Sequence, residues 1–169
     1  MTVIEDIIKE SIFVKQALLS QASEIGKAVS IIVETLRSDG VVYLFGNGGS
    51  AADSQHIAAE LVGKFEKQRK GLPAVALSTD TSILTSIGND YGFEYIFSRQ
   101  LEALLKPGDA VIGITTSGSS PNVIKALSFA KENGAKTIAL TGKKGKKLKK
   151  FCDATVIVDS KVTARIQES

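Results

Sequence analysis

The segment LFGNGGSAADSQHIAAEL, residues 44–61, places a glycine-rich loop between a short apolar run and a stretch with helical character. The loop itself reads Asn47-Gly48-Gly49-Ser50. Paired glycines let a backbone approach a ligand closely and turn its N–H groups toward it. The loop matches neither the dinucleotide pattern GxGxxG nor a P-loop, because no Lys-Ser or Lys-Thr follows. It is either a ligand-binding loop at the end of a strand or a tight strand-to-helix turn with nothing bound.

The helix expected after this loop carries polar side chains near its start. Ser50 is a suitable N-cap, and Asp53 suits the positive end of the helix. His56, the only histidine of the chain, stands four residues before Glu60, so the two side chains share one helix face. Such a pair can supply two ligands to one metal, and a carboxylate beside a sugar phosphate can act as a general base. A lone histidine is more often structural, so the pair by itself leaves both interpretations open.

Five short apolar runs follow one plan along the chain. Each is flanked by Gly, Pro, Asp or Ser, and helix-length segments separate them. Continuous apolar runs that alternate with helices are typical of a parallel sheet covered on both faces. The sequence therefore predicts an α/β fold with a three-layer, doubly wound, five-stranded parallel sheet. The expected strands are residues 41–45, 74–77, 110–114, 137–140 and 155–158.

The first forty residues instead have the apolar spacing of helices, and they predict an N-terminal helical pair. Gly40 is expected to end the second helix. We expect one domain, residues 1–169, with N-terminal helices at 1–40 and an α/β core at 41–169. The repeating residues are Ile4, Ile8 and Ile12 in the first helix, and Ile25, Val29, Ile32 and Leu36 in the second, where they predict a buried stripe.

A second loop, TTSGSSPNV at residues 115–123, follows the third expected strand. Ser120 is a plausible N-cap there, and Pro121 suits the first helical position. Hydroxyls and free N–H groups at a helix start form a neutral cradle for a phosphate, although a serine- and threonine-rich turn is the alternative. Open α/β sheets bind ligands at the carboxyl ends of their strands. Two such loops in one sheet therefore favour a phosphate loop beside a sugar-facing loop.

Composition excludes several classes of protein. The sequence contains no apolar run long enough for a membrane span, and the acidic N-terminus MTVIEDIIKE argues against a secretory signal and for the cytoplasm. A single cysteine, Cys152, cannot form an internal disulfide. The net charge of +3 is too weak to imply a nucleic-acid partner. The lysine-rich run KKGKKLKK, residues 143–150, lacks interleaved aromatics and is expected to be a solvated loop and helix start.

The motifs together resemble the sugar-isomerase (SIS) superfamily, and within it the phosphoheptose isomerases. The resemblance is carried by GNGGSAADSQHIAAEL, STDTSILTSIGNDYGFEYIFSRQ, ITTSGSSPNVIKAL, LTGKKG and TARIQE, in the family's order and over essentially the whole chain. It implies a flavodoxin-like SIS fold and a cytoplasmic homotetramer with active sites at subunit interfaces. It also implies an aldose–ketose isomerase that converts sedoheptulose 7-phosphate to D-glycero-D-manno-heptose 7-phosphate for bacterial lipopolysaccharide or capsule, with a zinc ion in some members.

The resemblance also implies roles for individual residues. Glu60 matches the catalytic glutamate. Three of four zinc-ligand positions are matched by His56, Glu60 and Gln167. The expected substrate-binding residues are Asn47, Gly48, Gly49, Ser50, Glu60, Asn89, Asp90, Thr115, Thr116, Ser117, Ser120 and Gln167.

The chain departs from the family pattern in one respect. The family's second catalytic residue is a histidine eight positions after the glutamine matched by Gln167, and Ser169 is the last residue here. Because TARIQES has the pattern of the first turns of an amphipathic helix, we expect a truncated C-terminal helix, a missing fourth zinc ligand and at best weak activity.

Three alternatives stay open at the level of sequence. One is a non-catalytic SIS module, either a sugar-phosphate sensor or a protein that associates with the replication initiator. The presence of both His56 and Glu60 favours the enzyme over it. Another is an isomerase for a different ketose phosphate, because the loops hold phosphate and hydroxyls without measuring chain length. A nucleic-acid binder based on the lysine-rich run is the least favoured.

Overall fold

The computed structural model describes residues 2–169 and contains the expected parallel sheet. The strands lie in the order β2-β1-β3-β4-β5, and every neighbouring pair is parallel. The chain moves from β1 to one side for β2 and to the other side for β3, so the strand order reverses between β1 and β3. The strands are β1 (Val42–Gly46), β2 (Ala74–Ala76), β3 (Ala110–Thr115), β4 (Lys136–Gly142) and β5 (Ala154–Val158).

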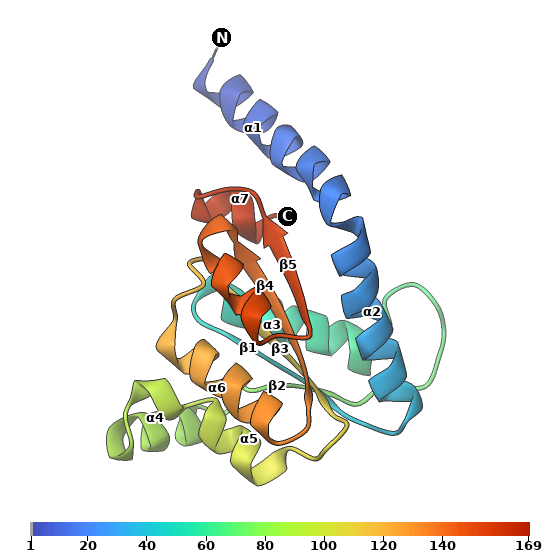
Figure 1. Ribbon diagram of the computed structural model, residues 1–169, viewed down its shortest axis with the longest axis vertical. Helices are drawn as coiled ribbons and strands as arrows, with labels where there is room; N and C mark the ends of the chain where they lie inside the picture. Colours follow the sequence, from blue (N-terminus) through green and yellow to red (C-terminus); the bar gives the residue numbers. More distant parts are fainter. Residues whose placement is uncertain (1) are drawn as a thin grey trace.

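Helices cover both faces of the sheet, as the continuous apolar runs predict (Figure 1). Along β1, Tyr43 and Phe45 belong to one buried cluster, with α5 and α6, while Val42 and Leu44 belong to the other, with α2 and α3. This alternation buries both faces of each central strand. The helices of the core are α3 (Gly49–Val62), α4 (Thr81–Asp90), α5 (Ser98–Leu104), α6 (Pro121–Glu132) and α7 (Thr163–Gln167), with 3-10 turns η2 (Phe93–Tyr95) and η3 (Lys143–Lys150).

Helix α6 packs closely against strand β3. A Cβ atom at Gly113 of β3 would lie within about 3 Å of side-chain atoms of Leu127 and Val123, so α6 rests directly on the strand. The N-terminus of α6 therefore stands just beyond the carboxyl end of β3. This is the place where the sequence predicts a phosphate loop.

The N-terminal region forms the expected two helices, α1 (Val3–Ala17) and α2 (Ala22–Arg37), joined end to end by η1 (Leu18–Gln21). Figure 1 shows α1 extending beyond the body of the domain. The predicted burial of the second-helix stripe is wrong in part. Val29 is 53% exposed and Ile25 is 37% exposed, whereas Ala28, Ile31 and Thr35 are buried. The physical reason is the rotation of α2, which turns Ala28, Ile31 and Thr35 toward the sheet and leaves Ile25 and Val29 lining a cavity. On α1, Ile4, Ile8 and Ile12 are also exposed.

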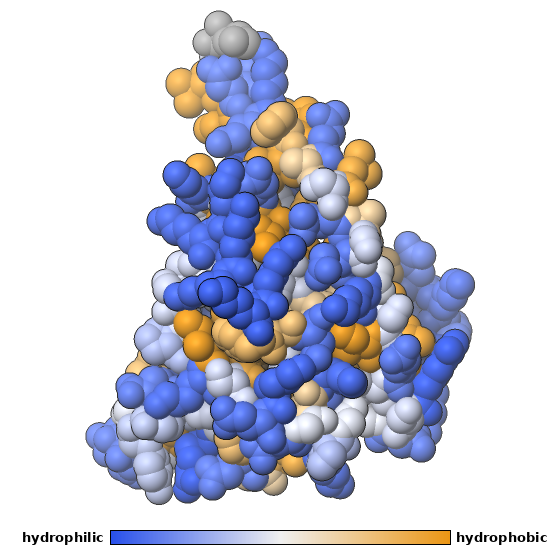
Figure 2. All heavy atoms as spheres, in the orientation of Figure 1, coloured by the Kyte–Doolittle hydropathy of each residue, from blue (hydrophilic) through white to orange (hydrophobic). Residues whose placement is uncertain are grey.

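Two surface features complete the fold. The six lysines of η3 are exposed while Gly145 and Leu148 are buried, which agrees with the expected solvated run; Figure 2 shows the broadly hydrophilic surface on this side of the molecule. Over residues 2–169, none of the helices combines the length and the hydropathy that crossing a membrane requires.

Candidate functional site

The loops after β1 and β3 meet at the reversal of strand order, where α/β sheets bind their ligands. Gly46 at the end of β1 pairs with Ile114 of β3, so Asn47 and Thr115 emerge at the same level. The side-chain amides of Asn47 and Asn122 exchange two hydrogen bonds of 2.9 and 2.8 Å across the gap between the loops. The two loops are therefore tied together.

The glycine loop needs its glycines for two different reasons. Gly48 has φ 58° and ψ −123°, a conformation that disfavours any side chain. A Cβ atom at Gly49 would collide with the side-chain amide of Gln167, so this glycine allows α7 to approach the loop. The structure thus brings three of the predicted residues, Gly48, Gly49 and Gln167, to one place.

The prediction that Ser50 caps α3 is wrong. The N-cap is Gly48 and the helix begins at Gly49, so Ser50 lies inside the first turn and is 3% exposed. The left-handed conformation of Gly48 starts the helix two residues early. Asp53 in turn falls outside the first turn, and its side chain lines a cavity beside α3.

The phosphate loop presents hydroxyls that contact one another. The hydroxyl of Thr115 lies 3.0 Å from that of Ser120 and 3.5 Å from that of Ser117. Ser120 is the N-cap of α6 and Pro121 its first residue, as predicted, but the Ser120 side chain makes no capping hydrogen bond. Its hydroxyl is turned toward Thr115 and is available to a ligand.

Backbone donors surround the same spot. Within residues 2–169, the N–H groups of Ser117, Ser120 and Asn122 have no hydrogen-bond acceptor. Gly118 has φ 64°, and a Cβ there would collide with the backbone of Gly145, so the loop is held against η3. Unpaired N–H groups at the positive end of a helix suit a phosphate dianion.

His56 and Glu60 lie on α3, which begins at the glycine loop. Nε2 of His56 is 3.7 Å from Oε1 of Glu60, and the two side chains are 74% and 34% exposed. Arg69 supports the end of this helix by donating to the carbonyl oxygens of Glu60 and Leu61 at 2.7 and 2.8 Å. The backbone at Glu60 is thus held at the capped end of α3, and the Glu60 carboxylate remains accessible.

A cavity of about 490 Å³ lies between α2, α3, α7 and the sheet. Its walls are mainly aliphatic, from residues such as Ile25, Leu140 and Val156. Four predicted site residues contribute to its lining: Ser50, His56, Thr116 and Gln167. The cavity therefore connects His56 and Gln167 with the start of the phosphate loop, whereas Glu60 does not line it.

Asn89 and Asp90 are not brought to this place. They end α4, both are exposed, and the amide of Asn89 donates to the carboxylate of Asp90 at 2.8 Å. Neither lines the cavity. Asp80, which precedes α4, accepts a hydrogen bond from the Ile83 N–H at 2.9 Å and so serves as an N-cap.

The residues of this chain provide a partial metal site. Zinc sites in proteins use three or four ligands, mainly Cys, His, Asp and Glu. His56 and Glu60 are two such ligands, but residues 2–169 contain no cluster of three or more. The set does not fit a zinc ion by itself, so the predicted zinc stays a prediction and no chemical step is assigned to it. Cys152 is also no candidate nucleophile, because burial raises the pKa of its thiol to about 11.

Asn122 is the residue of the site that the sequence analysis missed. It is 1% exposed and joins the two loops through Asn47. The available signal was its position one residue after Pro121 in the phosphate loop. An asparagine at a helix start is so common that its type carries no further information.

Comparisons with known proteins agree with this geometry. A family model described as SIS domain matches residues 9–142. The phosphoheptose isomerase of Aquifex aeolicus (strain VF5) is 57% identical over 166 residues, covering 98% of this chain and 87% of that protein. The solved phosphoheptose isomerase of Neisseria gonorrhoeae has a TM-score of 0.91 at 44% identity, covering 98% of this chain and 89% of that one. The Francisella tularensis enzyme has a TM-score of 0.92 at 36% identity, covering 99% and 92%. The chain therefore belongs to the SIS-domain family and, within it, to the phosphoheptose isomerases.

Proposed function

We propose that this chain isomerises sedoheptulose 7-phosphate to D-glycero-D-manno-heptose 7-phosphate, for the heptose of bacterial lipopolysaccharide or capsule. The observation that carries the proposal is the placement of Glu60. Its accessible carboxylate lies on the helix that begins at the glycine loop, and that loop is tied to the phosphate loop. Helix α3 thus carries a general base, and the neighbouring phosphate loop carries hydrogen-bond donors for a phosphate.

The phosphate end of the substrate is the anchor. The hydroxyls of Thr115, Ser117 and Ser120, with the unpaired N–H groups at the start of α6, bind the dianion. The phosphate ester is remote from the reacting carbons, so its binding energy serves to position C1 and C2. Asn47 and the N–H groups of the glycine loop contact the sugar hydroxyls.

Proton transfer at C1 and C2 accounts for the whole reaction. The Glu60 carboxylate takes a proton from C1 of the open-chain ketose and returns a proton to C2 of the enediol. The C2 carbonyl oxygen gains a proton and the C1 hydroxyl loses one. Substrate and product are isomers, so the balance needs no oxidant, reductant or second substrate. His56 stands beside the carboxylate, with its Nε2 3.7 Å from Oε1 of Glu60.

Self-association completes the proposal. The exposed isoleucines of α1 form an apolar stripe that a single chain leaves uncovered, and Figure 2 shows apolar patches along this helix. We infer a cytoplasmic homotetramer with sites at its interfaces, in which Asn89 and Asp90 reach the site of a neighbouring copy. Light scattering of the wild type should give four chain masses, and Ile8→Asp with Ile12→Asp should lower the mass. A monomeric wild type would contradict the tetramer.

The activity is tested by proton NMR in D2O. The chain is incubated with sedoheptulose 7-phosphate, and the C1 proton signals of the ketose and the appearance of the aldose are followed. We expect C1 deuteration and aldose formation, both faster than with fructose 6-phosphate as a competing ketose phosphate. Binding of the heptulose without exchange would instead identify a non-catalytic SIS module. Faster turnover of the hexulose would show that the substrate assignment is wrong.

A further inference from the structure

Asn122 is a deeply buried polar side chain, 1% exposed, at the start of α6, and it bonds to the glycine loop through Asn47. Its amide nitrogen donates to Oδ1 of Asn47 at 2.8 Å, and its Oδ1 accepts from Nδ2 of Asn47 at 2.9 Å. The same Oδ1 accepts from the N–H of Val123 at 2.9 Å. The two asparagines are 75 residues apart in the chain, one after β1 and one at the start of α6.

The Val123 bond determines which way both amides face. A backbone N–H can only donate, so the atom of Asn122 that meets it must be the oxygen. The nitrogen of Asn122 then faces Asn47, which must present its own oxygen there, and the nitrogen of Asn47 faces the oxygen of Asn122. Flipping either amide would place two donors or two acceptors against each other.

These hydrogen bonds leave part of the Asn47 side-chain amide unpaired. An amide has two N–H donors and two acceptor lone pairs, and Asn122 uses one of each. One N–H and one lone pair of Asn47 remain, and Asn47 is only partly buried whereas Asn122 is 1% exposed. Asn47 is therefore the member of the pair that a ligand can reach.

We propose that Asn122 is a positioning residue that orients the Asn47 amide toward the sugar and sets the spacing between the glycine loop and the phosphate loop. The inference rests on the proposed function, because it takes Asn47 as a contact to the sugar. The side chain of Asn122 itself touches no substrate. The start of α6 thus has two roles. Its helix dipole and unpaired N–H groups bind the phosphate directly, and its Val123 N–H orients the sugar-binding amide of Asn47 through Asn122.

A double-mutant cycle on binding tests this assignment. Dissociation constants for sedoheptulose 7-phosphate and for inorganic phosphate are measured for the wild type, Asn47→Ala, Asn122→Ala and the double variant. Losing a hydrogen bond to a sugar costs on the order of tenfold in affinity, so each single variant should bind the heptulose phosphate about tenfold more weakly. The double variant should be no weaker than Asn47→Ala alone. Inorganic phosphate should bind all four proteins within about twofold, because no sugar contact is involved.

Controls separate positioning from folding. Asn133→Ala removes the C-cap asparagine at the opposite end of α6, whose amide donates to the Phe129 carbonyl, and it should leave both affinities unchanged. If Asn122→Ala loses its cooperative thermal transition, Asn122→Ser replaces it, because a hydroxyl can still accept from the Val123 N–H but is too short to bond Asn47. Additive losses in the cycle, or an equal loss for inorganic phosphate, would overturn the proposal.

Failure of the Asn122 assignment can be distinguished from failure of the proposed isomerase. Wild-type binding of the heptulose phosphate without C1 exchange would remove the isomerase and leave the coupling of the two asparagines intact. Normal exchange with an additive cycle would remove the role of Asn122 and leave the isomerase intact. Should the wild type bind inorganic phosphate but not the heptulose phosphate, both would fall.

Discussion

His56 and Glu60 face each other across one turn of α3, with 3.7 Å between Nε2 and Oε1. The pair is exposed on one side, and exposed ion pairs contribute little, on the order of 1 kcal/mol or less. His56→Gln should therefore slow C1 exchange by about fivefold at most if the histidine acts only on the Glu60 charge. Exchange in D2O with sedoheptulose 7-phosphate measures the effect. A loss of several hundredfold would show that His56 does more, as a ligand to zinc would, and zinc analysis of the same sample would separate the two cases.

The hydroxyl of Ser120 should matter for binding and not for folding. It makes no capping hydrogen bond, so Ser120→Ala should leave the thermal midpoint nearly unchanged while weakening inorganic phosphate binding about tenfold. Asp80→Ala is the opposite case, because Asp80 does cap its helix: it should cost about 1 kcal/mol of stability and leave phosphate binding intact. Calorimetry and phosphate titration of both variants check the pair. Equal phosphate binding by Ser120→Ala and the wild type would exclude Ser120 from the phosphate site.

The left-handed conformation of Gly48 should make the glycine loop intolerant of a side chain. Gly48→Ala should lower the free energy of unfolding by about 1 to 3 kcal/mol and weaken sugar binding, because the loop must shift to relieve the strain. Gly26→Ala is the control: this glycine lies within α2 with open space around it, and alanine there should stabilise the chain by about 0.5 to 1 kcal/mol. Urea unfolding of both variants gives the comparison. A neutral Gly48→Ala would mean that the loop adopts another conformation in solution.

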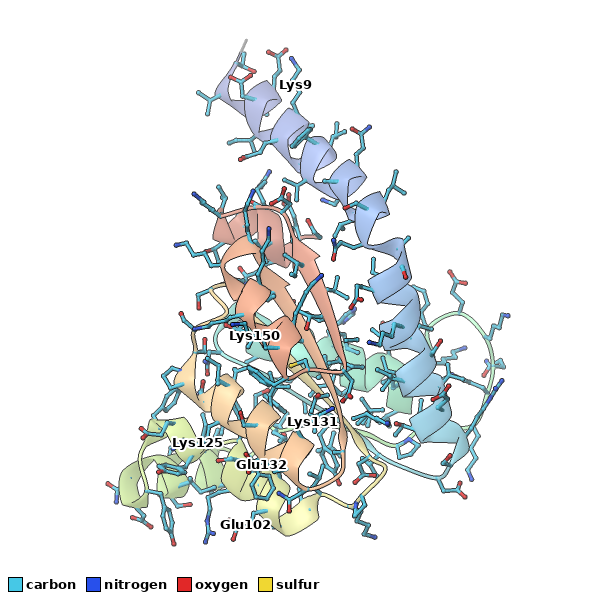
Figure 3. All side chains as sticks on the ribbon, in the orientation of Figure 1. Lys9, Glu102, Lys125, Lys131, Glu132 and Lys150 are labelled. Carbon is cyan, nitrogen blue, oxygen red and sulfur yellow. The ribbon has the colours of Figure 1, made fainter. Side chains whose placement is uncertain are left out.

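Asp153 should contribute stability that disappears in acid. Burial acts to raise the pKa of this carboxyl, but hydrogen bonds from Lys131 and from the Thr137 N–H and hydroxyl outweigh it, and the pKa lies below the ordinary 3.8. Figure 3 labels Lys131 on α6. Because the folded state holds the charged form more strongly, the contribution is complete above 3.8 and is lost as the pH falls through the lower folded pKa.

The variant Asp153→Asn isolates this contribution. It should cost about 1 to 2 kcal/mol at neutral pH, since it removes a charged hydrogen-bond acceptor. The difference from the wild type should shrink as the pH falls from 3.8 through the lower folded pKa, because Asp153 is then protonated and as neutral as asparagine. Unfolding free energies measured across this range decide the matter, and a difference that does not change with pH would show that the charge of Asp153 is irrelevant.

Much of the fold could be predicted because local patterns and tertiary structure agree. The run before Gly46 forms β1, the loop after it starts α3, and Pro121 begins α6 at the expected position. The burial of α2 could not be predicted in the same way. Helical spacing identifies an apolar face, but it does not say whether that face meets the sheet or another chain, and here Ala28 and Ile31 take the inner side.

The candidate site could likewise be predicted only in part. The loops and the His56–Glu60 pair follow from residue type and spacing, since both are local in sequence. The Ser50 cap failed because a glycine with positive φ can start a helix earlier than a hydroxyl would. Asn122 was missed because its partner lies 75 residues away. Asn89 and Asp90 end α4 and do not line the cavity, and local spacing does not say where the end of that helix packs.

The most direct test of the whole account is the exchange of the C1 protons of sedoheptulose 7-phosphate with D2O by Glu60→Gln, compared with Glu132→Gln. Glu132 is exposed at the carboxyl end of α6, the end opposite the phosphate loop, and is labelled there in Figure 3, so it offers the same chemical change outside the site. We predict that Glu60→Gln lowers exchange on the order of 100-fold or more while still binding inorganic phosphate, and that Glu132→Gln exchanges like the wild type. Wild-type exchange by Glu60→Gln would show that another group moves the proton.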